Sequence, residues 1–284
     1  MRAKARRWDV VSYPAPSVDV FRMVQQSEKQ QSHPVFTLAP SDLTFLLHEC
    51  LRCFYKKVVL GERRYSTPMP AIFTRLDKQQ RAFLDGKKTN AVHAELRPGV
   101  LHCEDRSLRS QPIPLPSGRA AVQFRGAIDA AAEFDDGSWG IIDFKTTGAK
   151  DAHVRLYSLQ LHAYALAAEN PEHGEPTMAP VTQLGLVCFE PRSMMLLPDK
   201  DVAYRATPTW VPVKRDDSAF LSFIDLIAFT LCLPKPPAPT PGCRWCKFMS
   251  RFGAEPVPSE HTSSERPTAR PPPRRTIWVT RRPS

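Results

Sequence analysis

The stretch GIIDFKTTG, residues 140–148, alternates like a β-strand but carries two charged side chains near its end. Successive side chains of a strand point to opposite faces, so Asp143 and Lys145 share one face. Ile142 and Phe144 point to the other face and would anchor it in a core. An acid and a base at the end of a buried strand do not help packing, so the pattern points to chemistry.

A second acid precedes this stretch in RGAID, residues 125–129. The runs on both sides of the turn DDG, residues 135–137, read as strands, and Asp-Gly between two such runs is a strong hairpin signal. The hairpin would place Asp129 on the strand beside Asp143. Neighbouring carboxylates repel each other. A divalent cation reverses this balance, because Mg²⁺ and Mn²⁺ take carboxylate and phosphate oxygens as ligands.

Lys145 adds a positive charge beside the two acids. A lysine next to a metal can orient an attacking water or stabilise the charge that develops on a cleaved phosphodiester. Asp129, Asp143 and Lys145 therefore make a workable phosphodiesterase centre. The competing interpretation is a simple salt bridge between Asp143 and Lys145 at a strand end, which the upstream acid makes less attractive.

Residues 151–170, DAHVRLYSLQLHAYALAAEN, predict a helix after this strand. One face of it, by 3–4 spacing, is formed by Tyr157, Gln160, Leu161, Tyr164 and Ala168. Gln160 is the polar exception on that face. It is either a core glutamine bonded to backbone or a side chain aimed at the charged edge of the sheet. Tyr164, one turn later, is placed to contact phosphate or a base.

The motifs GAID, IIDFKTTG and QLHAY, in this order, resemble the core of the PD-(D/E)xK nuclease superfamily. They are most similar to its RecB-like branch, which includes the nuclease domains of bacterial recombination helicase–nucleases and of CRISPR adaptation exonucleases. The resemblance covers residues 39–250. It implies an α/β, restriction-endonuclease-like core with a mixed central β-sheet flanked by helices. It also implies a Mg²⁺- or Mn²⁺-dependent DNA exonuclease.

The same resemblance implies roles for single residues of the strand. Asp129 and Asp143 would bind the metal, together with the backbone carbonyl of Phe144. Lys145 would assist the attacking water.

Further along, Gln160 and Tyr164 match the Q-x-x-x-Y motif of the branch. The branch usually has another metal ligand, a His or Glu on an early helix, often within G-x-x-x-H. Here PAIFTRLDKQQ offers Asp77 at the corresponding position, without the glycine. Asp77 is either a third metal ligand or a solvated helix residue.

Two C-x₂-C pairs, CLRC and CRWC, stand at opposite ends of the predicted folded region and contribute Cys50, Cys53, Cys243 and Cys246. This spacing lets two thiolates share one metal. Both pairs on one metal would staple the two ends together by closing a long loop. The nearby Cys232 leaves the choice of ligands open.

Some members of the resembled branch carry a [4Fe–4S] cluster that joins one early cysteine to three late ones. The resemblance therefore favours [4Fe–4S], although the split here is two and two. A Cys₄ set also suits structural zinc, which stays the alternative.

The net charge of +10 is concentrated at the two ends of the chain, with +3 in residues 1–9 and +3 in residues 255–284. Basic tails suit nucleic acid, but they are equally typical of solvated, disordered tails. The N-terminus has no apolar stretch of a secretory signal, and no apolar run approaches the roughly 18 residues of a membrane span. We therefore expect a cytoplasmic protein that does not bind membranes.

The predicted organisation has three parts: residues 1–38, largely irregular, a nuclease-like domain over 39–250, and a disordered, Pro-rich basic tail over 251–284. The expected helices are 39–61, with Ser41 as N-cap and Gly61 as stop, and 69–86, 151–170 and 217–232. The expected strands lie in 91–134, 138–147, 181–191 and 194–213. The Pro-rich residues 233–242 predict an extended connector.

The leading hypothesis is a metal-dependent DNA nuclease with a cysteine-bound metal. Its substrate would be DNA that is single-stranded or has free ends, and a helicase or a recombination and repair complex is a possible partner. The alternative is a catalytically inactive nucleic-acid-binding module of the same fold. A third hypothesis is a redox sensor built on an iron–sulfur cluster.

Overall fold

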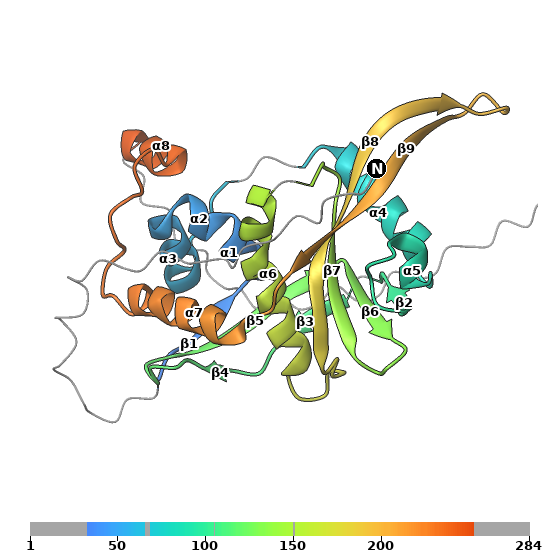
Figure 1. Cartoon of the computed structure of the whole chain (residues 1–284). Helices are drawn as coiled ribbons and strands as arrows, with labels where there is room; N and C mark the ends of the chain where they lie inside the picture. The colour runs from blue at the N-terminus through green and yellow to red at the C-terminus, as the bar shows by residue number, and fades with distance from the viewer. Residues whose placement is uncertain (1–32, 66–68, 105, 150, 253–284) are drawn as a thin grey trace, which may run out of the picture.

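The computed structural model describes residues 33–65, 69–104, 106–149 and 151–252. Within these ranges, two mixed β-sheets lie among helices (Figure 1), which confirms the predicted α/β class with mixed sheets flanked by helices. The predictions for residues 1–32 and 253–284 fall outside the described residues.

The strands divide between a four-stranded and a five-stranded sheet. They are β1 (Val35–Leu38), β2 (Gly99–His102), β3 (Arg106–Arg109), β4 (Ile113–Pro114), β5 (Ala121–Ile128), β6 (Ala130–Phe134), β7 (Trp139–Lys145), β8 (Val181–Leu196) and β9 (Val202–Val213). In the smaller sheet, β5 pairs with β1 in parallel and with β3 and β4 antiparallel. The larger sheet has the order β2-β6-β7-β8-β9, with β7 and β8 parallel and the other neighbours antiparallel.

The chain crosses from the smaller to the larger sheet at Asp129. Strand β5 ends at Ile128 and β6 begins at Ala130, so Asp129 is the single residue between them. The predicted hairpin forms between β6 and β7, with Ala130 opposite Ile142. Its first strand is shorter than expected, because the residues before Asp129 pair with the other sheet.

Strand β7 separates two hydrophobic clusters. Ile141 belongs to the larger cluster, which also contains Leu161 of the long helix that follows. Ile142 and Phe144 belong to the smaller cluster on the other face. The alternation read from the sequence is therefore confirmed, and each of these fully buried side chains contributes about 1.5–3 kcal/mol of burial free energy.

The helices are α1 (Pro40–Thr44), α2 (Leu46–Glu49), α3 (Leu51–Leu60), α4 (Ala71–Leu84), α5 (Thr89–Val92), α6 (Asp151–Glu169), α7 (Asp217–Leu231) and α8 (Arg244–Phe252). Three of them, α4, α6 and α7, confirm predicted helices. The start of α7 is fixed by Asp216, whose carboxylate accepts a hydrogen bond from the backbone N–H of Ala219 at 2.9 Å.

The prediction of one helix over residues 39–61 is wrong, because the segment forms α1, α2 and α3. Cys50 interrupts it with an extended backbone (φ −162°, ψ 111°). Ala39 rather than Ser41 is the N-cap of the first helix. Gly61 ends the last one with φ of 71°, a conformation that favours glycine, as predicted.

Four other features of the fold differ from the prediction. Strand β1 lies in a segment expected to be irregular, and its β-branched and aromatic residues find a partner in β5. The short helix α5 lies at the edge of a region expected to form strands, and α8 was not predicted. The strands β8 and β9 meet at residues 197–201, later than expected, and form a long hairpin that projects from the body (Figure 1).

Candidate active site and cysteine site

The two acids predicted to act together are neighbours at the joint between the sheets. The backbone N–H of Phe144 donates a hydrogen bond to Oδ2 of Asp129 at 3.0 Å. The carboxyl group of Asp129 lies close enough to raise the pKa of Asp143. The hairpin therefore places a second carboxyl group beside the one on β7.

Lys145 lies against the same acid pair. Its Nζ forms an ion pair with Oδ2 of Asp143 and sits 4.5 Å from the ring centroid of Tyr157 on α6. The salt bridge of the competing interpretation is thus present, but with a second acid beside it. We call Asp129, Asp143 and Lys145 the acid site.

Gln160 reaches from α6 to the acid site. Its Nε2 donates to Oδ1 of Asp143 at 3.1 Å, and its Oε1 accepts from the hydroxyl of Thr44 at 3.3 Å. The side chain is buried and points at the charged end of the sheet, as the functional interpretation expected. Tyr164 lies one turn further along and is buried.

Burial makes the acid site electrostatically unfavourable when both acids are ionised. Burial is the main reason why the pKa of Asp143 rises to about 7. The charge of Lys145 lowers this pKa and offsets part of the effect, while repulsion by Asp129 raises it further. Burial also raises the pKa of Asp129. It disfavours the charged form of Lys145 too, but the carboxylate of Asp143 outweighs this and raises the pKa of the lysine.

A divalent cation fits this arrangement. With both carboxyl groups ionised, two negative charges face one lysine in a buried position, and a hard cation with oxygen ligands would neutralise the excess. The geometry is thus suited to Mg²⁺ or Mn²⁺, which take oxygen ligands.

Asp77 is less closely associated with the acid site. It lies on α4, pairs with Arg81 at 2.6 Å and is 37% exposed. Its charge still acts on Asp129, whose pKa it helps to raise. Within the described ranges, the carboxylates of Asp77, Asp129 and Asp143 do not form a group of ligand atoms close enough to share one metal ion. Its role as a third ligand remains a prediction.

Thr44 and Tyr157 were not singled out as site residues from the sequence. Thr44 fixes the amide of Gln160 from a position 116 residues away, and no local pattern announces such a contact. Tyr157 was assigned only to the apolar face of α6, yet its ring lies under the lysine. Its place one turn before Gln160 on the same helix face was the available signal.

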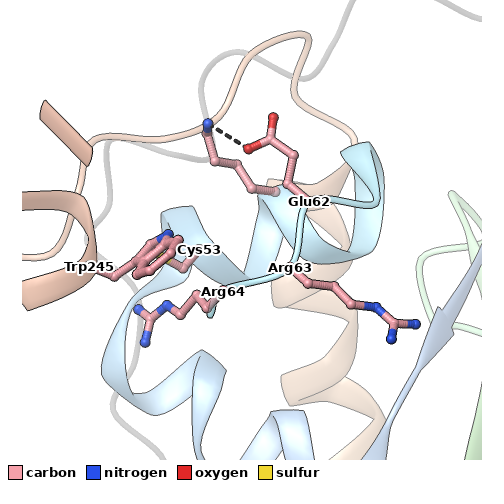
Figure 2. A pocket seen from close by; sticks show the side chains of 6 residues that line it. Cys53, Glu62, Arg63, Arg64 and Trp245 are labelled. Atoms are coloured by element: carbon pink, nitrogen blue, oxygen red, sulfur yellow. Dashed lines mark hydrogen bonds and ion pairs between the residues drawn. The ribbon is translucent and has the colours of Figure 1, made fainter. Parts of the chain in front are cut away.

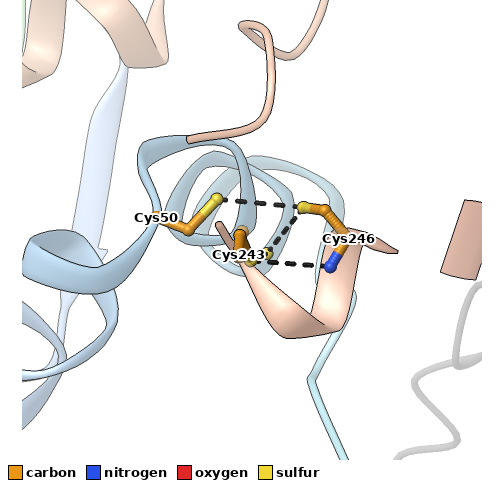
Figure 3. A group of neighbouring side chains, drawn as sticks. Cys50, Cys243 and Cys246 are labelled. Carbon is orange, nitrogen blue, oxygen red and sulfur yellow. Dashed lines mark hydrogen bonds between the residues drawn. The ribbon is translucent and has the colours of Figure 1, made fainter. Parts of the chain in front are cut away.

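The four cysteines of the two C-x₂-C pairs come together, with their sulfur atoms all within 4.8 Å of one another. We call Cys50, Cys53, Cys243 and Cys246 the cysteine site. Figure 3 shows Cys50, Cys243 and Cys246 turned towards one another. The site joins α3 to α8 and offers four cysteine ligands that could hold a metal.

The two pairs have the same local geometry. Cys50 directly precedes α3 and Cys243 directly precedes α8, so each first cysteine begins a helix and each second cysteine lies in its first turn. The carbonyl of Cys50 accepts from the N–H of Phe54 at 3.0 Å, and that of Cys243 from Lys247 at 3.1 Å. The break at Cys50 is thus what gives the first pair its shape.

Positive charge and hydrogen bonds surround the sulfur atoms. Arg64 donates to Sγ of Cys243 at 3.2 Å and to Glu49 at 2.7 Å. Burial opposes ionisation of Cys50, but hydrogen bonds from Thr240 and the N–H of Cys53 lower the pKa of Cys50 to about 6. Burial raises the pKa of Cys53 to about 11.

A small pocket lies beside the cysteine site. Figure 2 shows Cys53, Arg64 and Trp245 along it. Lys56 also lines the pocket and forms an ion pair of 2.8 Å with Glu62. The pocket is separate from the residues of the acid site.

An acid pair with a lysine on a mixed α/β core is suited to phosphodiester hydrolysis with a divalent metal. The model of the PD-(D/E)XK nuclease superfamily matches residues 23–251, most of the chain. The chain therefore belongs to this superfamily, whose members are generally phosphodiesterases acting on nucleic acid.

Two other comparisons add no functional argument. A solved structure titled "Crystal structure of SSO0001" is 16% identical to this chain, with a TM-score of 0.42 and a match that covers 74% of this chain and 82% of that one. The comparison with curated proteins gives no significant match.

In the part of the chain that the structure describes, no helix is long and apolar enough to cross a membrane.

Proposed function

We propose that this protein is a metal-dependent DNA nuclease of the RecB-like branch, acting as an exonuclease. The observation that carries the proposal is the buried Asp143 beside the half-buried Asp129, with Lys145 and Gln160 both bound to the carboxyl group of Asp143. Superfamily membership supports it, because it supplies the nucleic-acid substrate class.

In this proposal, Asp129 and Asp143 hold Mg²⁺ or Mn²⁺ together with the carbonyl of Phe144. The metal supplies a polarised phosphate oxygen and an activated water. Lys145 would donate to the attacking water or to the negative charge that develops on the phosphate. Gln160 holds the carboxyl group of Asp143 in orientation, and Asp77 is the candidate third ligand.

The cysteine site has a structural role in this proposal. It connects α3, near the start of the described chain, to α8, near its end, and so closes the domain around the nuclease core. The resemblance to the RecB-like branch favours a [4Fe–4S] cluster here, with zinc as the alternative.

The proposed substrate is DNA that is single-stranded or has free ends, and a helicase or recombination and repair complex is the proposed partner. Cleavage of linear and of circular DNA of the same sequence separates exonuclease from endonuclease action. We expect Mn²⁺-dependent release of nucleotides from linear DNA, while closed circles stay intact. Cleavage of both at equal rates would contradict the exonuclease assignment.

A second candidate function is a catalytically inactive nucleic-acid-binding module. It is favoured by the ion pair of Lys145 with Asp143 and by the pairing of Asp77 with Arg81, which leave the candidate ligands bound to cations of the chain itself. This alternative predicts salt-sensitive DNA binding without metal-dependent cleavage.

A further inference from the structure

The spacing of the sulfur atoms in the cysteine site restricts what can bind there. Sγ of Cys246 lies 3.8 Å from that of Cys50 and 3.4 Å from that of Cys53, while the sulfurs of Cys53 and Cys243 are 3.9 Å apart. The remaining pairs also lie within 4.8 Å. The four atoms are therefore close to van der Waals contact and surround one small central position.

A single tetrahedral ion matches this spacing. Zinc binds thiolate sulfur at about 2.3 Å, and a regular tetrahedron of that radius has edges of about 3.8 Å. The three distances above fall on both sides of that value. A central ion would thus bond to all four sulfurs with shifts of a few tenths of an ångström.

An iron–sulfur cluster requires a wider arrangement. In a [4Fe–4S] cluster each thiolate binds a different iron at a corner of a cube, which holds the cysteine sulfurs roughly 6 Å apart. Four irons and four sulfides do not fit between sulfur atoms that nearly touch. Three of the cysteines, Cys50, Cys53 and Cys243, are buried, and Leu46 and Trp245 pack against them.

The backbone around the sulfurs supports the same conclusion. The N–H of Cys246 points at Sγ of Cys243 at 3.5 Å, and each pair lies at the start of a helix, α3 or α8. Each pair thus brings two sulfur atoms from the start of its helix to the same position, as two C-x₂-C pairs do when they share a metal. Arg64 adds a positive charge that offsets part of the negative charge of a tetrathiolate ion.

We infer that the cysteine site holds one zinc ion in place of the [4Fe–4S] cluster that the family resemblance implies. This inference rests on the proposed function only in taking the cysteines as metal ligands, and it is independent of cleavage at the acid site. Zinc is preferred over a single iron because a closed Cys₄ tetrahedron is its usual structural site.

Metal analysis of the full chain, purified without oxygen, tests the inference. We expect one zinc per chain, no acid-labile sulfide and no visible absorption. Growth in medium with cobalt in place of zinc should give the visible bands of tetrahedral Co²⁺ with thiolate ligands. Iron with an equal amount of sulfide, a single iron without sulfide, or a metal-free chain would each overturn it.

Two matched variants locate the ion. Cys246→Ser should lose the cobalt bands or shift them, whereas Cys232→Ser, at an exposed cysteine outside the site, should keep them. Unchanged bands in Cys246→Ser would overturn the assignment of ligands. The wild-type spectrum and stoichiometry decide the question even if Cys246→Ser does not fold. Nuclease activity measured on the same sample is a separate readout: a zinc-loaded but inactive chain contradicts the proposed function and leaves the zinc inference standing.

Discussion

Asp143 is the residue on which the proposed chemistry depends most. It is almost completely buried, yet it shares its surroundings with a second acid, a lysine and a glutamine. A carboxyl group in such a place is stable when it is protonated or when a cation is bound, and it is strained when ionised alone. This property can be measured apart from catalysis.

Asp143 should make the stability of the protein depend on pH. Because its pKa rises from 3.8 in the unfolded chain to about 7 in the folded one, the folded state binds more protons between these values. Its contribution to stability is therefore lost as the pH rises from about 4 to 7. The melting temperature of Asp143→Asn, relative to wild type, should increase across this window when no divalent metal is added.

Thermal unfolding followed by circular dichroism measures this difference. Adding Mn²⁺ above pH 7 should stabilise the wild type and leave Asp143→Asn unaffected. A constant difference between the two proteins over the whole pH range would show that Asp143 has an ordinary pKa.

Gln160 should influence activity through the orientation of Asp143. Replacing it by leucine removes the donor to Oδ1 and leaves the hydroxyl of Thr44 without its acceptor. We expect a stability loss of about 1–3 kcal/mol and a larger Mn²⁺ requirement for cleavage. Gln123→Leu is the matched control, because Gln123 is a buried glutamine that donates to the carbonyl of Ser110 instead. A loss of activity of equal size in both variants would refute the positioning role.

At the scale of elements, the break between α2 and α3 determines where the first cysteine pair lies. In a continuous helix, Cys50 and Cys53 would lie on one side of the helix. With the extended backbone at Cys50, the sulfur atoms of this pair instead lie close to those of Cys243 and Cys246 at the start of α8. The apolar spacing of residues 39–61 is helical throughout, so the sequence pattern predicts one helix. The break at Cys50 instead falls where the two cysteine pairs meet.

Removal of the metal from the cysteine site should loosen α8 and destabilise the whole domain. A structural metal contributes several kcal/mol to the free energy of unfolding. Removing it with a chelator, or replacing a ligand in Cys246→Ser, should therefore lower the melting temperature by roughly 10 °C or more. Cys232→Ser should leave it nearly unchanged. An unaltered melting temperature after complete metal removal, checked by metal analysis, would mean that the site does not hold the domain together.

At the scale of the whole molecule, short sequence patterns predict some features of the fold, whereas others depend on contacts between residues far apart in the chain. The alternation in residues 140–148, the Asp-Gly turn and the face of α6 are local patterns, and they predict the acid site and its neighbour Gln160. Strand β1 and the contact of Thr44 with Gln160 depend on partners 86 and 116 residues away, which no local pattern specifies. The sequence therefore predicts the residues of the acid site better than the elements that surround it.

Cleavage of end-labelled linear DNA in the presence of Mn²⁺ is the most direct test of the central claim, that the acid site is a nuclease centre. Wild type should cleave, and both Asp143→Asn and Lys145→Ala should lose roughly 10²-fold or more of the rate. Asp135→Asn, at an exposed acid in the turn of the same hairpin, should retain it. Equal rates in wild type, Asp143→Asn and Lys145→Ala, or no metal-dependent cleavage by a folded wild type, would contradict the claim.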